Sequence, residues 1–260
     1  MKRILNIILW AIIIAGVIFV VGFINKKHDN QSLKKIIVNI QPDENDNFIT
    51  QDDIYSILGE IHDSIAGCSF ADIDIEAIER SISDNQYIQK SNVHVTIDGT
   101  MEIDVILRKP IVRVINTENR ECYIDIDGYI MGLHKSKVSH VLIASGIIQD
   151  PLSGESVWDS ENSRNSLEDN DLATVYKLAN YITNHEFYDA MIEQIYFNRN
   201  GDIELIPKLG NHTIILGDTN DLDIRMNKLM VFYLKGLRNM DWYKYKTINL
   251  KYNNQVVCSK

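Results

Sequence analysis

Residues 92–107 read NVHVTIDGTMEIDVIL and form the clearest local pattern of the chain. Apolar side chains alternate with polar ones on both sides of Asp98-Gly99, from Val93 to Ile97 and again from Met101 to Leu107. Strict alternation is typical of a strand with one buried face, and an Asp-Gly pair tolerates the positive backbone angles of a two-residue turn. This stretch therefore predicts an antiparallel β-hairpin.

The segment before this hairpin predicts a strand and two short helices. The β-branched run at residues 36–40 is typical of a strand. Residues 51–61 carry isoleucine and leucine at helical spacing, and a second helix with a similar apolar stripe follows before the hairpin begins. The candidate caps are Thr50 with Asp53 for the first helix and Asp72 or Asp74 for the second.

The order strand, helix, helix, strand, strand makes residues 36–108 one predicted α+β module, and a second module occupies residues 109–260. We expect the second to be a mainly antiparallel β domain with two helices, at residues 171–185 and 222–238. Residues 149–170, which are rich in Ser, Asn, Asp and Glu, predict a loop. Three turns predict hairpins in the second module: Asp127-Gly128, Asn200-Gly201 and Asn253-Asn254.

Residues 4–25 contain no ionisable side chain, and 15 of the 22 are Ile, Leu, Val or Phe. As a helix this run is roughly 33 Å long, which is enough to cross a hydrocarbon core about 30 Å thick. It is too long for a cleaved signal peptide and is followed by a charged stalk at residues 26–35. We therefore expect a single-pass transmembrane helix, with residues 1–3 as a cytoplasmic tail and the C-terminal modules outside the cytoplasm.

Residues 36–260 carry 20 Lys and Arg against 35 Asp and Glu, which gives a formal charge of −15. Nucleic acid is excluded as an expected partner, because binding it requires a basic surface that releases counterions. The sequence contains no zinc-protease helix, phosphate loop, dinucleotide fingerprint or nucleophile elbow. We expect no catalytic residue, metal, cofactor or small-molecule substrate. Whether Cys122 pairs with Cys258 stays open at this stage.

The end of the chain alternates from Thr247 to Tyr252, turns, and continues into Val256 and Val257. If this last strand lies at the edge of a sheet, its free N–H and C=O groups are a template for a strand of another protein. The alternative is an internal strand that only completes the sheet.

The chain resembles the bacterial cell-division family FtsQ/DivIB, whose members place a POTRA domain and a β domain after a single membrane span. The resemblance rests on the hairpin that runs into Arg108-Lys109-Pro110, on Tyr123-Ile124-Asp125-Ile126-Asp127-Gly128, and on Gly217 followed by Lys228-Leu229 and Thr247–Tyr252. It implies a divisome scaffold at the inner membrane rather than an enzyme. Two other functions remain as alternatives: a membrane-anchored cell-envelope enzyme and a POTRA-type envelope assembly factor.

The resemblance also implies the partners and their site. FtsQ-like proteins bind the division proteins FtsB and FtsL outside the membrane, and an FtsB strand adds to the edge of the last strand. The POTRA-like module is expected to contact other divisome components. Carried over by position, the partner-binding residues in this chain are Asn249, Leu250, Lys251, Tyr252, Gln255, Val256 and Val257.

Overall fold

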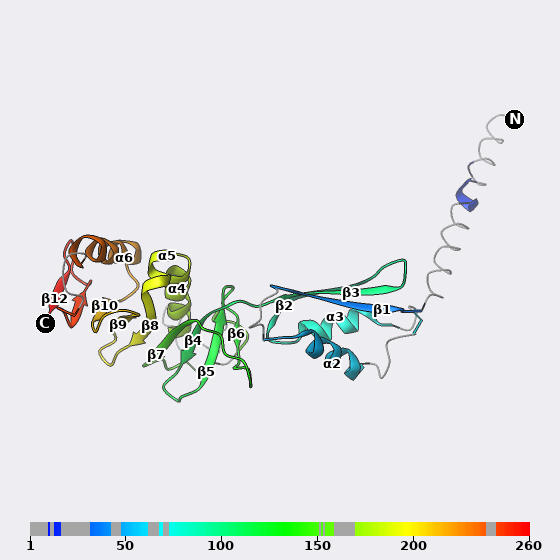
Figure 1. Cartoon of the computed structure of the whole chain (residues 1–260), viewed down its shortest axis with the longest axis horizontal. Coiled ribbons are helices and arrows are strands. Elements are labelled where there is room, and N and C mark those ends of the chain that lie inside the picture. Colours follow the sequence, from blue (N-terminus) through cyan, green and yellow to red (C-terminus); the bar gives the residue numbers. More distant parts are fainter. Residues whose placement is uncertain are drawn as a thin grey trace. The chain divides into compact units, whose positions relative to one another are not determined.

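The computed structural model describes residues 10, 13–16, 32–42, 48–61, 68–69, 73–150, 152, 154–158, 170–237 and 243–260. These fall into two compact units, Met1–Leu107 and Arg108–Lys260 (Figure 1). The predicted membrane span at residues 4–25 lies outside the described residues, apart from residues 10 and 13–16, which are helical. Within the described ranges, no helix combines the length and the apolar character that crossing a membrane requires.

The first unit is a three-stranded sheet with two helices on one face (Figure 1). β1 pairs in parallel with β3, and β2 pairs antiparallel with β3, so that the order is β1-β3-β2. The predicted hairpin is confirmed, with Val95 opposite Met101, although Ile97 lies in the turn and is 82% exposed. The elements are β1 (Lys35–Gln41), α2 (Gln51–Ile61), α3 (Ile75–Ser83), β2 (Ile88–Val95) and β3 (Thr100–Leu107).

Both helices of this unit begin where the sequence predicted. The backbone N–H of Thr50 donates to the Asp53 carboxylate over 2.8 Å, and the Asp53 N–H donates back to the Thr50 hydroxyl over 3.4 Å, which is the reciprocal capping box. Asp74 caps α3 by accepting from the Ala77 N–H over 2.9 Å. The apolar stripes of both helices are buried, and so is one face of β3. The residues are Ile54 and Leu58 of α2, Ile78 and Ile82 of α3, and Met101, Ile103 and Val105 of β3.

The second unit is built on one sheet of nine strands, in the order β12-β11-β10-β9-β8-β7-β4-β5-β6. α4, α5 and α6 join the strands of this unit (Figure 1), and residues of α4 and α6 share one hydrophobic core with residues of the sheet. The strands are β4 (Pro110–Ile115), β5 (Glu121–Asp125), β6 (Ile130–Met131), β7 (Leu142–Gly146), β8 (Ile192–Phe197), β9 (Ile203–Pro207), β10 (Thr213–Gly217), β11 (Thr247–Asn249) and β12 (Val257–Ser259).

The sheet is more mixed than the sequence predicted. Three neighbouring pairs, β4–β7, β7–β8 and β10–β11, run parallel, and each is separated in the chain by an excursion through other elements. A parallel pair has no local turn that would reveal it in the sequence, since its strands need a long crossover. The hairpins at Asp127-Gly128 and Asn200-Gly201 are confirmed as β5–β6 and β8–β9.

The helices of this unit also differ from the prediction. α4 (Asp171–Thr183) is followed at once by a helix that the sequence analysis missed, α5 (Glu186–Met191). α6 (Leu222–Val231) was predicted, but it continues as a π-helix, η4 (Phe232–Leu237). Of the predicted loop at residues 149–170, the described residues Asp150, Val157 and Asn170 are buried.

Candidate functional site

The last strand of the chain is one of the two edges of the nine-stranded sheet. β12 pairs antiparallel with β11, with Thr247 opposite Ser259 and Asn249 opposite Val257, and no other described strand pairs with it. The Cys258 side chain packs against the core, whereas Val257 is 41% exposed. The sheet therefore ends in a short strand with one free side.

The structure gathers the seven predicted partner-binding residues in one hairpin but divides them among three environments. Asn249 lies in β11, and Leu250 is fully buried. Lys251, Tyr252 and Gln255 are exposed in the connection between the strands, and Val256 is half-buried there. Of the seven, Val257 alone belongs to β12.

The turn of this hairpin is wider than the sequence predicted. A two-residue turn at Asn253-Asn254 would place Tyr252 opposite Gln255, but the observed register leaves residues 250–256 as a connecting loop. Asn254 adopts a positive φ of 57°, so the predicted turn residue is used in a wider turn. The edge consequently consists of residues 257–259, two positions later than the stretch predicted from the sequence.

Contacts from neighbouring elements hold this loop, which we call the edge loop (residues 250–256). The Lys228 ammonium on α6 donates to the carbonyl oxygens of Leu250 and Tyr252 over 2.8 and 2.7 Å. Lys251 forms an ion pair with Asp202 at 2.7 Å. Burial, followed by the nearby Arg225 charge, lowers the pKa of Lys228.

Gly217, at the end of β10, explains how the stem of Lys251 fits there. Its φ is +89°, and a Cβ at this position would lie 2.8 Å from Lys251 Cγ and 3.3 Å from an Arg225 guanidinium nitrogen. A side chain would therefore be strained and would also push Lys251 away. Glycine is required here both for its backbone angle and for its lack of a side chain.

The opposite edge of the sheet, at β6, is covered. Ser156 forms an antiparallel bridge with Tyr129, the Ile130 N–H donates to the Glu155 carbonyl over 2.9 Å, and the Val157 N–H donates to the Gly128 carbonyl over 3.0 Å. The Trp158 ring meets Tyr176 edge-on at 5.5 Å between centroids. Residues 154–158, which we call the cover segment, thus occupy backbone groups that would otherwise be free.

Comparison with known proteins identifies this architecture. A family model described as FtsQ/DivIB, C-terminal related, matches residues 109–259, which is more than half of the chain and almost all of the second unit. The chain belongs to the FtsQ/DivIB family. A model described as a POTRA-like domain matches residues 31–106 of the first unit. A search of curated proteins found no match.

FtsQ/DivIB is a family of non-enzymatic cell-division proteins. Burial raises the pKa of the Cys122 thiol to about 12 and also raises that of Cys258, so neither is a ready thiolate nucleophile. Both are unpaired: Cys258 lies in the edge strand β12, and Cys122 lies in β5, seven strands away along the sheet and next to the other edge. Among the described residues, no group of His, Cys, Asp and Glu could hold a metal ion.

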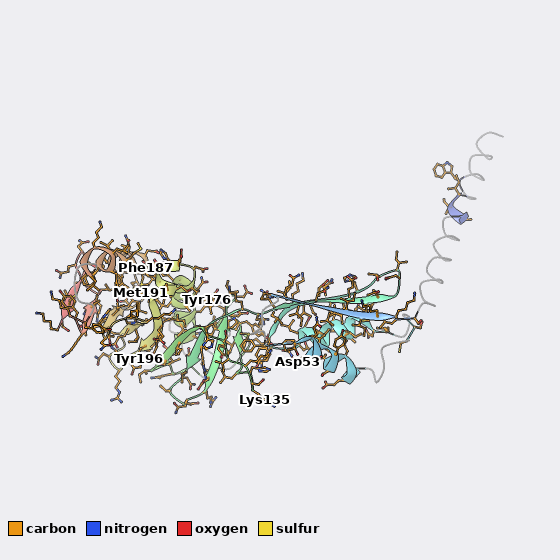
Figure 2. The ribbon with its side chains drawn as sticks, viewed as in Figure 1. Asp53, Lys135, Tyr176, Phe187, Met191 and Tyr196 are labelled. Carbon is orange, nitrogen blue, oxygen red and sulfur yellow. The ribbon has the colours of Figure 1, made fainter. Side chains whose placement is uncertain are left out.

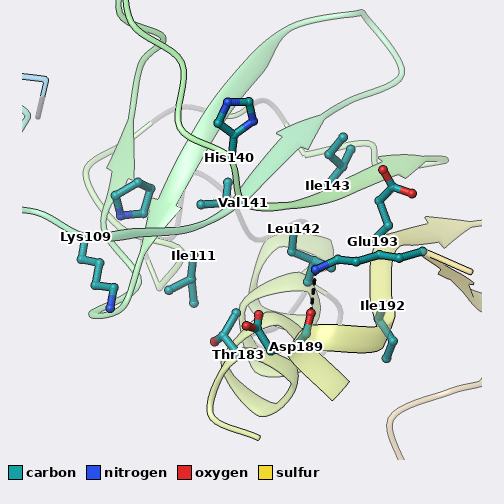
Figure 3. A pocket seen from close by; sticks show the side chains of 12 residues that line it. Lys109, Ile111, His140, Val141, Leu142, Ile143, Thr183, Asp189, Ile192 and Glu193 are labelled. Carbon is teal, nitrogen blue, oxygen red and sulfur yellow. Dashed lines mark hydrogen bonds between the residues drawn. The ribbon is translucent and has the colours of Figure 1, made fainter. Parts of the chain in front are cut away.

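Two hollows lie away from the edge strand of this FtsQ/DivIB domain. One, of about 490 Å³, opens where β4, β7 and β8 begin, and Asp189 is among its lining residues (Figure 3). Lys208, which also lines it, donates from Nζ to the Asp189 carbonyl over 2.7 Å. The other, of about 1090 Å³, is lined by Phe187 and Met191 of α5, both labelled in Figure 2, and by Leu234 of η4. The first has a charged lining and the second a mostly apolar one.

The sequence analysis also missed a segregation of charge within this family member. Residues 222–260 carry eight Lys and Arg against two Asp and Glu, whereas residues 36–221 carry 12 against 33. Counting charge over the whole of residues 36–260 concealed this difference. In the structure the described cations of the C-terminal part lie on α6 and η4 or beside β11 and β12: Arg225, Lys228, Lys235, Lys244, Lys246, Lys251 and Lys260.

Proposed function

We propose that this protein is a divisome scaffold that docks FtsB- and FtsL-like division proteins by strand addition to β12. The observation that carries the proposal is the difference between the two sheet edges of the second unit: β6 is covered by the chain itself, whereas no described strand pairs with the outer side of β12. Proteins generally blunt an exposed edge strand unless they use it. Added strands gain affinity from main-chain hydrogen bonds.

The direction of the backbone groups identifies the residue at the centre of this edge. The Leu250 N–H donates to Ile215 in β10, so by alternation Asn249 and Thr247 turn their backbone groups toward β12. Their partners Val257 and Ser259 then face β11, and Cys258 between them presents its N–H and C=O to the open side. A docking strand would form its central hydrogen-bonded pair with Cys258.

The side chains around the edge favour an acidic partner with apolar anchors. Tyr252 is 50% exposed and Val257 41% exposed, and aromatic residues of this kind are frequent hot spots in interfaces. Lys244 and Lys246 precede β11, and Lys260 follows β12. Positive charge at this end of an otherwise acidic chain would steer acidic segments toward the edge.

The proposal includes a location. We infer an inner-membrane protein whose residues 4–25 form the anchor, with the N-terminus in the cytoplasm and both units outside it. Partners anchored in the same membrane would meet β12 at a high effective concentration, so that even a short edge strand could be occupied.

Two variants of one residue test strand addition. Cys258→Pro removes the outward N–H, whereas Cys258→Ala changes the same side chain and keeps that donor. The tagged full-length protein is purified from its own membranes, and the proteins that accompany it are identified. Small single-pass coiled-coil proteins should accompany the wild type and the alanine variant, and the proline variant should lose them while its urea unfolding midpoint stays near that of the alanine variant.

Equal recovery of these proteins with a folded proline variant would rule out strand addition at β12. Recovery of none of them with the wild type would contradict the scaffold itself.

A further inference from the structure

Lys228 connects α6 to the edge loop and lies outside the set of partner-binding residues that the sequence suggested. Lys228 is half-buried, and its ammonium group donates to two carbonyl oxygens of the loop, those of Leu250 at 2.8 Å and Tyr252 at 2.7 Å. Hydrogen bonds from a charged donor are shorter and stronger than neutral ones. One side chain therefore fixes the backbone on both sides of Lys251.

These two carbonyls lie at the point where β11 ends and the edge loop begins. Leu250 is buried and still bonded to β10 through its N–H, whereas Tyr252 is half-exposed and the three residues that follow it are exposed. Lys228 is thus attached both to a fixed residue and to the first exposed one. Without it, the path from Leu250 to Val257 would depend on the Lys251–Asp202 ion pair, which is partly open to solvent, and on the contact of Val256 with the core. The Lys251 N–H would also still donate to the Asn249 side-chain oxygen over 2.9 Å.

We infer that Lys228 is a positioning residue for partner docking: it holds the edge loop so that Tyr252 and β12 are already in their binding conformation before a partner arrives. The inference rests on the proposed function. Ordering a loop in advance raises affinity, because the partner does not have to supply the free energy that restricts the loop.

The chain offers a matched control for charge. Lys235 lies seven residues further along the same helical segment, in η4, where it lines a hollow with Asn254 and Val256, but no described hydrogen bond joins it to the edge loop. Lys228→Met and Lys235→Met each remove one positive charge, but only the first removes the two bonds to the edge loop. Lys228→Arg keeps the charge and can still donate to a carbonyl pair.

Amide hydrogen exchange in the partner-free, full-length protein tests the positioning itself. Lys228→Met should speed exchange in residues 250–259 by about tenfold, the factor for losing a hydrogen bond of ordinary net strength. Exchange in β8 and β9 should be unchanged. Lys235→Met should match the wild type, and Lys228→Arg should restore part of the protection. Should the methionine variant not fold, Lys228→Gln is measured in its place.

Recovery of the FtsB-like protein from membranes is then measured for the same four proteins. Capture should fall with Lys228→Met and recover with Lys228→Arg, at unchanged urea unfolding midpoints. Unchanged exchange in residues 250–259 of Lys228→Met, or an equal loss of capture with Lys235→Met, would overturn the positioning role. Failure of the wild type to capture any partner would instead contradict the proposed function, and the exchange data would still decide whether Lys228 orders the loop.

Discussion

The nine-stranded sheet has a short strand at each edge, and the described residues cover β6 but leave the outer side of β12 open. Between β7 and α4 the chain returns to β6, where the cover segment bonds to Gly128 and Ile130. Asn170, the cap of α4, holds this segment by donating to the Val157 carbonyl over 2.7 Å. At β12 the chain instead places a basic surface, an exposed tyrosine and a free strand side.

This difference teaches which edge is structural and which is available. An unprotected edge strand carries a risk of association with the wrong partner. Because the sheet leaves one edge unprotected and covers the other, the unprotected edge is expected to have a use. The small size of β12 limits that risk, because three residues offer little template to a non-specific strand. Charge adds selectivity, since a basic edge disfavours basic partners.

The largest effect is expected at the covered side. Asp125 is buried, accepts from Arg108 over 2.9 Å, and also accepts the N–H groups of Asp127 and Tyr129 in the β5–β6 turn. Asp125→Asn keeps an oxygen for the turn but leaves the Arg108 charge, which is stacked on Tyr129, without its anion. We expect the free energy of unfolding to fall by about 3 kcal/mol, measured by urea denaturation.

The exposed ion pair of the adjacent hairpin is the control for this variant. Glu118 and Arg120 lie 2.7 Å apart with more than 60% of each side chain exposed, so Glu118→Gln should change stability by less than about 0.5 kcal/mol. Similar losses in the two variants would mean that the Arg108–Asp125 pair does not stabilise the β6 side.

An aromatic residue at each edge separates stability from binding. Tyr252→Ala should weaken partner binding by about tenfold or more with little change in stability, because half of this side chain is exposed and an aromatic anchor is a hot-spot candidate. Trp158→Ala should do the reverse and cost about 1 kcal/mol through loss of its contact with Tyr176. Titration of the captured partner and urea denaturation give the two readings. If only the Trp158 variant lost partner binding, the partner would dock at the β6 edge, and docking at β12 would be contradicted.

A glycine at each edge gives a smaller effect. Gly128 has a φ of +79° and Gly217 one of +89°, and a Cβ would lie 3.2 Å from the Trp158 ring nitrogen or 2.8 Å from Lys251 Cγ. Gly128→Ala and Gly217→Ala should each cost about 1–2 kcal/mol in unfolding experiments, from backbone strain. Only Gly217→Ala should also reduce partner capture, because it displaces the edge loop. A reduction of equal size in Gly128→Ala would show that the two edges are not independent.

Much of the local structure could be predicted because its causes are local. The capping box at Thr50 and the turn at Asp98-Gly99 depend on side chains within a few residues of the backbone groups that they serve. The parallel pairing of β10 with β11 depends on packing between residues more than 30 positions apart, and no turn in the sequence signals it. α5 was missed because it has only six residues and no side-chain cap, so that no local signal marks its start.

The edge strand β12 was predictable only in part. Alternation located a terminal strand, but alternation is the same in an edge strand and in an internal one, and the family resemblance had to decide between them. The wider turn moved the strand to residues 257–259. Lys228 is part of the family resemblance, but its contact with the edge loop could not be found from the sequence, since its bonds reach main-chain oxygens 22 and 24 residues away.

The central claim is that β12 is a docking edge and β6 is not. Amide exchange of the full-length protein with and without its captured partner tests it most directly. We predict that the Cys258 N–H exchanges freely in the isolated protein and becomes protected in the complex, while the amides of residues 129–131 keep their exchange rates. A complex in which the Cys258 N–H still exchanges freely would contradict the account.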